Sequence, residues 1–273
     1  MKKYIFFLFF LTAIAANAQQ YEIVTDIPYY AALQAGKDSY LESTCTLDLY
    51  YPKDKKGFPT IIWFHGGGLT GGEKEIPKEL MEQGFAVIGV GYRLSPKVTA
   101  PTYIEDATAA TSWVFQNIQK YGGNPDVIFL SGHSAGAYLA LMVSMDKKYL
   151  QKYAIDANKI AAVASLSAQV ITHFTIREER GIKITQPIID DYAPIYHVRA
   201  DLPPILLFTG DAEKELMGRY EENAFMYRTL LLNNAQGARL YKMDGYDHGN
   251  MRLGSFPLML KELSRITRRL KQD

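Results

Sequence analysis

The chain lacks several features that would place it in a particular class of protein. Its 273 residues include one cysteine, so no disulfide can form within the chain. That residue, Cys45, stands in an alternating stretch and is expected to be a buried strand residue rather than a reactive thiol. The sequence has no internal repeat, no low-complexity segment, and no cysteine cluster or His-x-x-x-His pair that would bind a metal. We expect no disulfide scaffold, no repeat fold and no metal site.

An excess of charge of one sign is also absent. Lys and Arg together number 30 and Asp and Glu 29, which gives a formal net charge of +1. This balance offers no electrostatic reason to expect a nucleic acid or an anionic membrane as partner. Beyond the N-terminus, no run is apolar enough to span a bilayer, which takes about 20 residues. A neutral or small molecule is the expected ligand, and the sequence leaves the oligomeric state open.

The N-terminus has the pattern of a secretory signal peptide. Two lysines precede an apolar run over residues 4–15, and Ala16-Asn17-Ala18 provides the small residues of a cleavage site. We expect residues 1–18 to be removed and residues 19–273 to form one domain. The mature protein is then exported, either periplasmic or secreted.

After the signal sequence, strand-like and helix-like blocks alternate, which favours a mostly parallel sheet covered by helices on both faces. Short, mainly apolar runs predict strands at 46–51, 60–64, 86–90, 127–131, 161–166, 205–209 and 238–242. Helices are predicted at 77–83, 103–121, 135–145, 219–233 and 257–271. The connection 169–192 shows little regular pattern, and its length predicts a small cap insertion over the site.

The sharpest motif is Gly132-His133-Ser134-Ala135-Gly136, between a predicted strand and a predicted helix. This is Gly-x-Ser-x-Gly in the context of a nucleophile elbow. A serine on so tight a turn brings the residues two positions away close to the backbone, and glycine removes the clashing Cβ atoms. Ser134 is therefore the predicted nucleophile.

A glycine run, His65-Gly66-Gly67-Gly68, follows the second predicted strand. Glycines there free backbone N–H groups to converge on a negative charge, as in the oxyanion loop of lipases and esterases. No Gly-Lys-Ser/Thr follows, so a phosphate loop is disfavoured. The predicted oxyanion donors are the N–H groups of Gly66, Gly67 and Ala135, and His65 is expected to order the loop.

A serine needs a general base, and the base in turn needs an acid to hold it. His248 follows the last predicted strand and is the predicted base. His133 is expected to point away from the nucleophile, and His173 and His197 are expected to be surface or core residues. Two acids, Asp211 and Glu213, follow the strand 205–209, and the residues alone leave both open.

Taken together, these motifs resemble the esterase branch of the α/β-hydrolase fold, similar to hormone-sensitive lipase and to bacterial feruloyl and acetyl-xylan esterases. The resemblance covers most of the mature chain. It is carried by Leu47–Pro52, His65–Gly68, Tyr92–Pro96, Gly132–Gly136 and Asp247–Gly249.

The resemblance implies the α/β-hydrolase fold, with Ser134 as nucleophile, His248 as base and no cofactor. It implies Glu213 as the acid, three residues after the glycine that closes the strand, with Asp211 as the alternative. The family usually has Asp at that place, so Glu213 is a departure. Related formamidases, which act on aryl formamides, carry an aromatic residue where this chain has Leu69, and this difference disfavours a formamidase.

The function expected from the sequence is a secreted serine hydrolase of small acyl or aryl esters. The 19 tyrosines suit stacking on sugar rings or aryl groups, so a glycan-linked acetyl or feruloyl ester is the expected substrate class. An amide hydrolase of the same fold, either a peptidase or a formamidase, is the alternative. A binding protein without catalytic activity is a third hypothesis.

Overall fold

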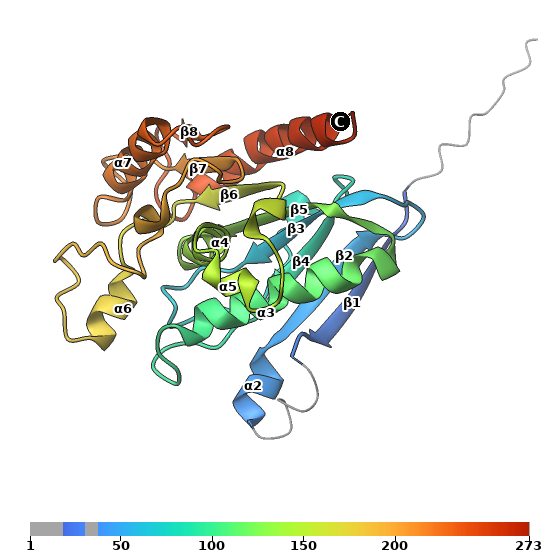
Figure 1. Ribbon diagram of the computed structural model, residues 1–273, viewed down its shortest axis with the longest axis horizontal. Coiled ribbons are helices and arrows are strands. Elements are labelled where there is room, and N and C mark those ends of the chain that lie inside the picture. Colours follow the sequence, from blue (N-terminus) through green and yellow to red (C-terminus); the bar gives the residue numbers. More distant parts are fainter. Residues whose placement is uncertain (1–18, 31–37, 273) are drawn as a thin grey trace, which may run out of the picture.

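One eight-stranded sheet runs through the part of the chain that the computed structural model describes, residues 19–30 and 38–272. The predicted signal sequence lies outside these residues. The strand order is β1-β2-β4-β3-β5-β6-β7-β8 (Figure 1). The strands are β1 (Tyr21–Pro28), β2 (Thr46–Pro52), β3 (Phe58–Phe64), β4 (Ala86–Val90), β5 (Gly123–His133), β6 (Ala162–Leu166), β7 (Ile205–Thr209) and β8 (Arg239–Lys242).

The sheet is antiparallel only at one edge. β1 pairs antiparallel with β2 and β2 antiparallel with β4, whereas every pairing from β4 across to β8 is parallel. β3, β4, β6 and β7 are buried along their whole length, as expected of parallel strands covered on both faces. Because the parallel strands run the same way, the loops after β3, β5, β6, β7 and β8 all lie at the carboxyl ends of the strands, along the same border of the sheet.

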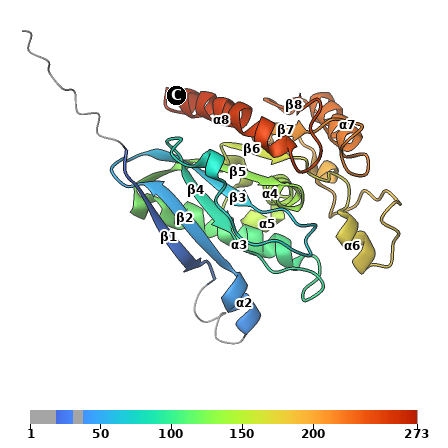
Figure 2. The same cartoon turned by 180° about the vertical axis from the view of Figure 1, so that it is seen from behind.

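Helices cover the two faces unequally. The helices are α2 (Ser39–Thr44), α3 (Thr102–Asn117), α4 (Ala135–Met145), α5 (Lys148–Gln151), α6 (Phe174–Glu179), α7 (Arg219–Leu232) and α8 (Met251–Leu270). Side chains of α3, α4, α5 and α7 share one apolar cluster with the sheet, and side chains of α8 share the other. Figure 2 shows α8 on the opposite side of the sheet from α3 and α5. This is the layered architecture that the resemblance implies.

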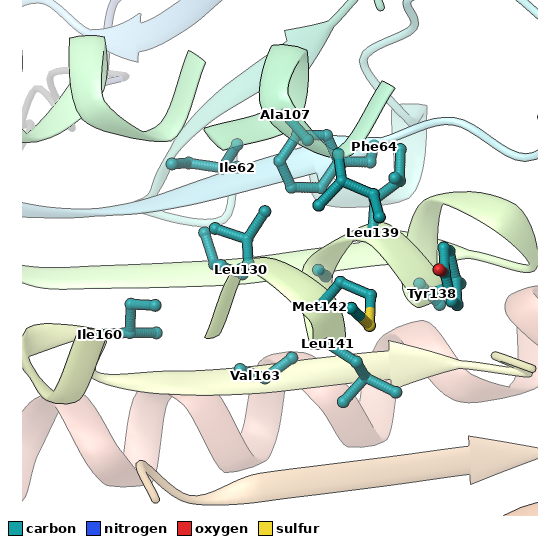
Figure 3. Packing of buried hydrophobic residues seen from close by; sticks show 14 of the residues in the cluster. Ile62, Phe64, Ala107, Leu130, Tyr138, Leu139, Leu141, Met142, Ile160 and Val163 are labelled. Atoms are coloured by element: carbon teal, nitrogen blue, oxygen red, sulfur yellow. The ribbon is translucent and has the colours of Figure 1, made fainter. Parts of the chain in front are cut away.

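The centre of the larger cluster is α4, which follows β5 directly. All eleven of its residues are buried, so this helix is apolar on every side and packs within the core. Figure 3 shows Leu139 and Met142 of α4 near Ile62 of β3 and Leu130 of β5. The fold thus anchors rigidly the helix whose first residue is predicted to complete the oxyanion hole.

Most predicted elements are present, but the structure differs from the prediction in several places. The strand β1 and the short helices α2, α5 and α6 have no predicted counterpart. The helix predicted at 77–83 is wrong, because only the 3₁₀ turn Lys78–Leu80 forms and Glu82 and Gly84 take positive φ angles. The last helix begins at Met251 rather than at Pro257, which lies inside it.

Cys45 is 2% exposed and stands directly before β2, where its thiol is buried. Among the described residues, no helix is both long and apolar enough to cross a membrane.

Candidate active site

The residue on the sharp turn between β5 and α4 is Ser134. Its φ is +55°, a left-handed conformation that side chains rarely adopt, and its N–H donates to the carbonyl of Leu166 in β6 (2.8 Å). The turn places Ser134 at the carboxyl edge of the sheet, with 8% of the residue exposed. Strain of this kind persists only where the surroundings enforce it, and it concentrates at functional sites.

The two glycines of the motif are required by sterics, as the sequence predicts. A Cβ atom on Gly132 would lie 2.5 Å from the carbonyl carbon of Gly136, and one on Gly136 would lie 2.0 Å from the carbonyl oxygen of Phe64. Both contacts are with backbone, which cannot rotate away. Any larger residue would push α4 off β3.

Gly136→Ala is therefore expected to lower the free energy of unfolding by about 3 kcal/mol, the upper range for an overpacked core. Gly71→Ala is the matched control, because a Cβ there meets nothing closer than 3.9 Å. Urea denaturation of both variants measures the difference. Equal stabilities for the two variants would contradict the steric argument.

Ser134 and His248 come together as the sequence predicts. The imidazole Nε2 lies 2.9 Å from Ser134 Oγ, although the two residues are 114 positions apart. His248 sits in the loop after β8, where Asp247 Oδ1 accepts the N–H groups of Gly249 (2.9 Å) and Asn250 (2.8 Å). This local turn holds the imidazole beside the hydroxyl of Ser134.

The acid that contacts the imidazole is Glu215, which corrects the sequence prediction of Glu213 or Asp211. Glu215 Oε2 lies 2.8 Å from His248 Nδ1, and the Glu215 side chain is 1% exposed. A carboxylate only accepts, so Nδ1–H of His248 donates to it. In neutral His248 the other nitrogen, Nε2, is then free to accept the proton of Ser134 Oγ.

Neither predicted acid reaches the imidazole, because the chain turns once after β7. The N–H groups of Lys214 and Glu215 both donate to the carbonyl of Asp211, so the loop folds back and returns Glu215 to the strand end. Glu213 is exposed on the outside of this turn. Asp211 instead joins two loops, since its Oδ2 accepts the N–H of Gly245 (2.8 Å).

Glu215 is kept ionised by its surroundings. Burial alone would raise its pKa, but hydrogen bonds from His248, Gly210 N–H (2.7 Å) and Ser167 (2.8 Å) prevail and lower the pKa to about 2. The carboxylate is therefore negative at every pH at which the protein would work. A fixed negative charge on Nδ1 stabilises the imidazolium that forms when His248 takes a proton.

The depressed pKa predicts a stability effect in acid. Between pH 4.5 and about 2, the unfolded chain binds a proton at Glu215 and the folded chain does not, so stability from this group falls as the pH falls. Glu215→Gln has no such group. The stability advantage of the native protein over Glu215→Gln should therefore shrink between pH 5 and pH 3 in urea denaturation. A constant difference would show that Glu215 is not held in its charged form.

His133 also belongs to the site, whereas the sequence predicts that it points away. Its Nε2–H donates to the carbonyl of His248 (2.8 Å), and the two rings lie 4.8 Å apart. Burial, and then the neighbouring His248, lowers the pKa of His133 to about 4. His133 is thus neutral at pH 7 and supports the loop that carries His248 without adding a positive charge beside it.

The glycine loop lies against the turn that carries Ser134. A Cβ on Gly66 would lie 3.2 Å from the carbonyl oxygen of His133, a tight contact, and 3.6 Å from Cβ of Ser134, so the loop runs directly beside Ser134. The carbonyl of Gly67 accepts the N–H groups of Thr70 and Gly71, which closes the loop into a tight turn. Ala135 is the first residue of α4, and the first N–H groups of a helix have no partner within it.

His65 orders this loop as the sequence predicts. Its Nδ1 lies 2.7 Å from the carbonyl of Gly66, and its ring stacks on Tyr92 at 4.2 Å. The hydroxyl of Tyr92 donates to the carbonyl of His65 (2.7 Å). Burial lowers the pKa of His65, which suits a neutral structural residue.

The segment 169–192, expected to be a cap, contains the short helix α6 and packs on the glycine loop. Thr175 donates to the carbonyl of Gly68, and a Cβ on Gly68 would lie 3.1 Å from the ring of Phe174. The imidazole of His173 is fully buried beside Tyr138, as expected for a core histidine, while His197 lies in the turn after this segment. The segment therefore supports the loop that carries the predicted oxyanion donors.

Solved structures share this fold. One is described as a truncated form of a carbohydrate esterase from gut microbiota, with a TM-score of 0.74 and 21% identity over 93% of this chain and 99% of that chain. Esterase B from Lactobacillus rhamnosis has a TM-score of 0.73 and 20% identity over 93% of this chain and 89% of that chain. These likenesses confirm the predicted α/β-hydrolase fold.

The sequence relatives align with this chain over only part of their own length. A probable isoprenylcysteine alpha-carbonyl methylesterase of Oryza sativa subsp. japonica, ICMEL1, is 28% identical over 75% of this chain and 54% of its own length. The probable carboxylic ester hydrolase LipM of Mycobacterium tuberculosis is 26% identical over 56% of this chain and 40% of its own length. The chain thus spans about half the length of these relatives. The BD-FAE family model, in contrast, matches residues 47–220, which include the glycine loop, the serine turn and Glu215, and the chain therefore belongs to the BD-FAE family.

Proposed function

We propose that this protein is a serine hydrolase that cleaves carboxylic esters, with Ser134 as nucleophile, His248 as base and Glu215 as acid. The observation that carries the proposal is the hydrogen-bond chain from Ser134 Oγ to His248 Nε2 (2.9 Å) and from His248 Nδ1 to Glu215 Oε2 (2.8 Å). These three groups have the geometry and the order of roles of an activated serine.

The reaction proceeds in two acyl-transfer steps. Ser134 Oγ attacks the ester carbonyl while His248 Nε2 takes its proton, and the negative oxygen of the tetrahedral intermediate turns toward the N–H groups of Gly66, Gly67 and Ala135. His248 then returns the proton to the leaving alcohol, which leaves an acyl group on Ser134. Water, deprotonated by the same imidazole, then attacks the acyl carbonyl, and His248 returns that proton to Ser134 Oγ as the bond between Oγ and the acyl carbon breaks and the carboxylic acid leaves. The residues of the chain supply every proton transfer, so no cofactor is needed.

The proposed substrates are small acyl or aryl esters, including acetyl or feruloyl groups linked to a glycan. Two of the similar proteins are described as a carbohydrate esterase and a carboxylic ester hydrolase. The proposed substrates therefore include esters in which the alcohol is part of a glycan, as well as esters of small alcohols.

A fluorophosphonate probe tests the serine mechanism directly. The purified protein should be labelled at Ser134, and Ser134→Ala should not be labelled. Peptide mass spectrometry locates the modified residue. If the native protein is folded but is not labelled, the serine-hydrolase proposal is wrong, and the hypothesis of a binding protein without catalytic activity is favoured.

A substrate panel separates esters from amides. Nitrophenyl acetate, acetylated xylan, a feruloylated sugar and matched aryl amides and formamides are compared at equal concentration. The proposal expects the esters to be cleaved faster, and the glycan-linked esters to be cleaved with a lower KM than the free alkyl acetate. Faster cleavage of the amides or formamides would favour a peptidase or a formamidase that uses the same residues.

Export is part of the same proposal and rests on the pattern of residues 1–18. The mature chain is then expected to begin at Gln19. N-terminal sequencing of the protein recovered from the periplasm or the medium tests this. Recovery of an uncleaved chain from the cytoplasm alone would contradict it.

A further inference from the structure

A second serine, Ser167, is buried behind the base. It follows the last residue of β6, is 0% exposed, and takes a φ of +54°. Its N–H donates to the carbonyl of Phe208 in the neighbouring strand β7 (2.7 Å). A serine with a positive φ is strained, whereas a glycine would adopt the same backbone without strain. What the serine has and a glycine would lack is its hydroxyl group, so the contacts of that hydroxyl are the feature of interest.

The hydroxyl of Ser167 contacts the acid and the base at the same time. Its Oγ lies 2.8 Å from Glu215 Oε1 and 2.9 Å from His248 Nδ1. Since the carboxylate can only accept, the hydroxyl proton is donated to Glu215. The Nδ1–H of His248 then points between two acceptors, Oε2 of Glu215 and Oγ of Ser167. One arrangement of protons satisfies all three groups.

The backbone of Ser167 is fixed from behind by α7. The buried guanidinium of Arg219 donates to the carbonyl of Ser167 (2.6 Å), and Asn223 Nδ2 donates to the carbonyl of Ala168 (2.9 Å). Both side chains are 0% exposed. With the backbone fixed in this way, Cβ of Ser167 has one position, and from it the hydroxyl reaches both Glu215 and His248.

From this geometry we infer that Ser167 is a fourth, positioning member of the site, one that locks the Nδ1–H tautomer of His248 and the orientation of the Glu215 carboxylate. The inference rests on the proposed function, because it concerns how the acid and the base of that reaction are held. Ser167 touches no substrate. Its loss therefore lowers the rate of the chemical step and leaves substrate binding as it was.

The test compares Ser167→Gly and Ser167→Ala with the native protein. Glycine takes the positive φ without strain, and alanine keeps the Cβ. An effect common to both variants is therefore due to the missing hydroxyl and not to a change in the backbone. Ser165→Ala is the matched control: Ser165 lies two residues earlier, within β6, is 0% exposed, and its hydroxyl has no hydrogen-bond partner among the described residues. Ester hydrolysis, fluorophosphonate labelling rate and thermal melting are measured for all four proteins.

Both Ser167 variants should lose about 10- to 100-fold in kcat, the size expected when a hydrogen bond to a charged group is removed. Their KM should remain within about twofold of native, since only a transition-state interaction is lost. The low-field proton resonance of His248 Nδ1–H should shift in both, because one of its two acceptors is gone. Ser165→Ala should match native in every measurement.

Native kcat and an unmoved proton resonance in Ser167→Gly and Ser167→Ala, with an active native protein, would overturn the inference. A loss of kcat as large in Ser165→Ala would overturn it too, by showing that any buried hydroxyl of this strand matters. An inactive and unlabelled native protein is a different result, because it removes the proposed function itself.

Discussion

Ser134→Ala is expected to lower kcat for ester hydrolysis by about 10⁶-fold, and His248→Ala by a similar factor. The double variant should be no slower than either single variant, because the two side chains act as one unit: Ser134 is a weak nucleophile without the base, and the base has nothing to activate without Ser134. The 2.9 Å contact between Ser134 Oγ and His248 Nε2 is the physical basis. Initial rates with nitrophenyl acetate at enzyme concentrations high enough to detect the residual rate measure the effect.

The residual rate is itself informative. Backbone N–H groups at the glycine loop remain in all three variants, so activity roughly 10³-fold above the uncatalysed reaction should persist. Losses that multiply in the double variant would mean that Ser134 and His248 act in separate steps. The hydrogen-bond chain would then not be the catalytic unit.

Motifs enforced by backbone sterics could be predicted from the sequence. The two glycines of the serine motif stand where a Cβ would meet backbone atoms of the turn and of β3, so the presence of both glycines in the sequence indicates the turn. The same holds for the strand before and the helix after it, whose apolar runs are long and continuous. Ser134, Ala135 and the glycine loop lie at the ends of such elements, and the parallel order of the strands brings them to one edge.

The acid could not be placed by the same reasoning. Its position depends on how a loop of eight residues folds between Gly210 and Arg219, and that loop contains three carboxylates. A count from the strand end selects Glu213, whereas the turn closed by Asp211 moves the contact two residues on, to Glu215. The presence of a third acid in the loop was the only signal in the sequence.

Two other residues had no motif to reveal them. Ser167 stands in an ordinary Leu-Ser-Ala stretch, and its role depends on a left-handed φ and on side chains from α7. His133 is adjacent to the nucleophile, where a tight turn suggests that the ring points away, but its Nε2 reaches the loop of His248. Both contacts are between residues at least 48 positions apart in the chain, which no local pattern encodes.

The fold was mispredicted only at its margins. β1 is an edge strand with exposed positions and an irregular register between Val24 and Ile27, so its sequence lacks the apolar run that marks the inner strands. The segment 77–83, expected to be a helix, has two buried residues, Pro77 and Leu80, and its 3₁₀ turn has no side-chain cap. A short segment without an apolar face or a cap has too little to stabilise a helix.

Glu215→Gln is expected to lower kcat/KM by about 10⁴-fold, whereas Glu213→Gln should leave it within about twofold of native. The amide keeps the size of the side chain but removes the charge, and its NH₂ group, if turned toward His248, favours the tautomer with Nδ1 unprotonated. In that tautomer Nε2 carries a proton and cannot accept one from Ser134. The charge and the tautomer are therefore both lost in a single atom replacement.

Glu213 is the right control because it lies in the same loop, has the same side chain and is exposed. Steady-state kinetics of the two variants with one ester decide between them. A large loss in Glu213→Gln with little change in Glu215→Gln would restore the assignment made by counting from the strand end, and it would require the loop to refold in the working enzyme. The direct contact of Glu215 with His248, supported by Gly210 and Ser167 on its other oxygen, makes the opposite outcome the expected one, since three donors converge on this carboxylate alone.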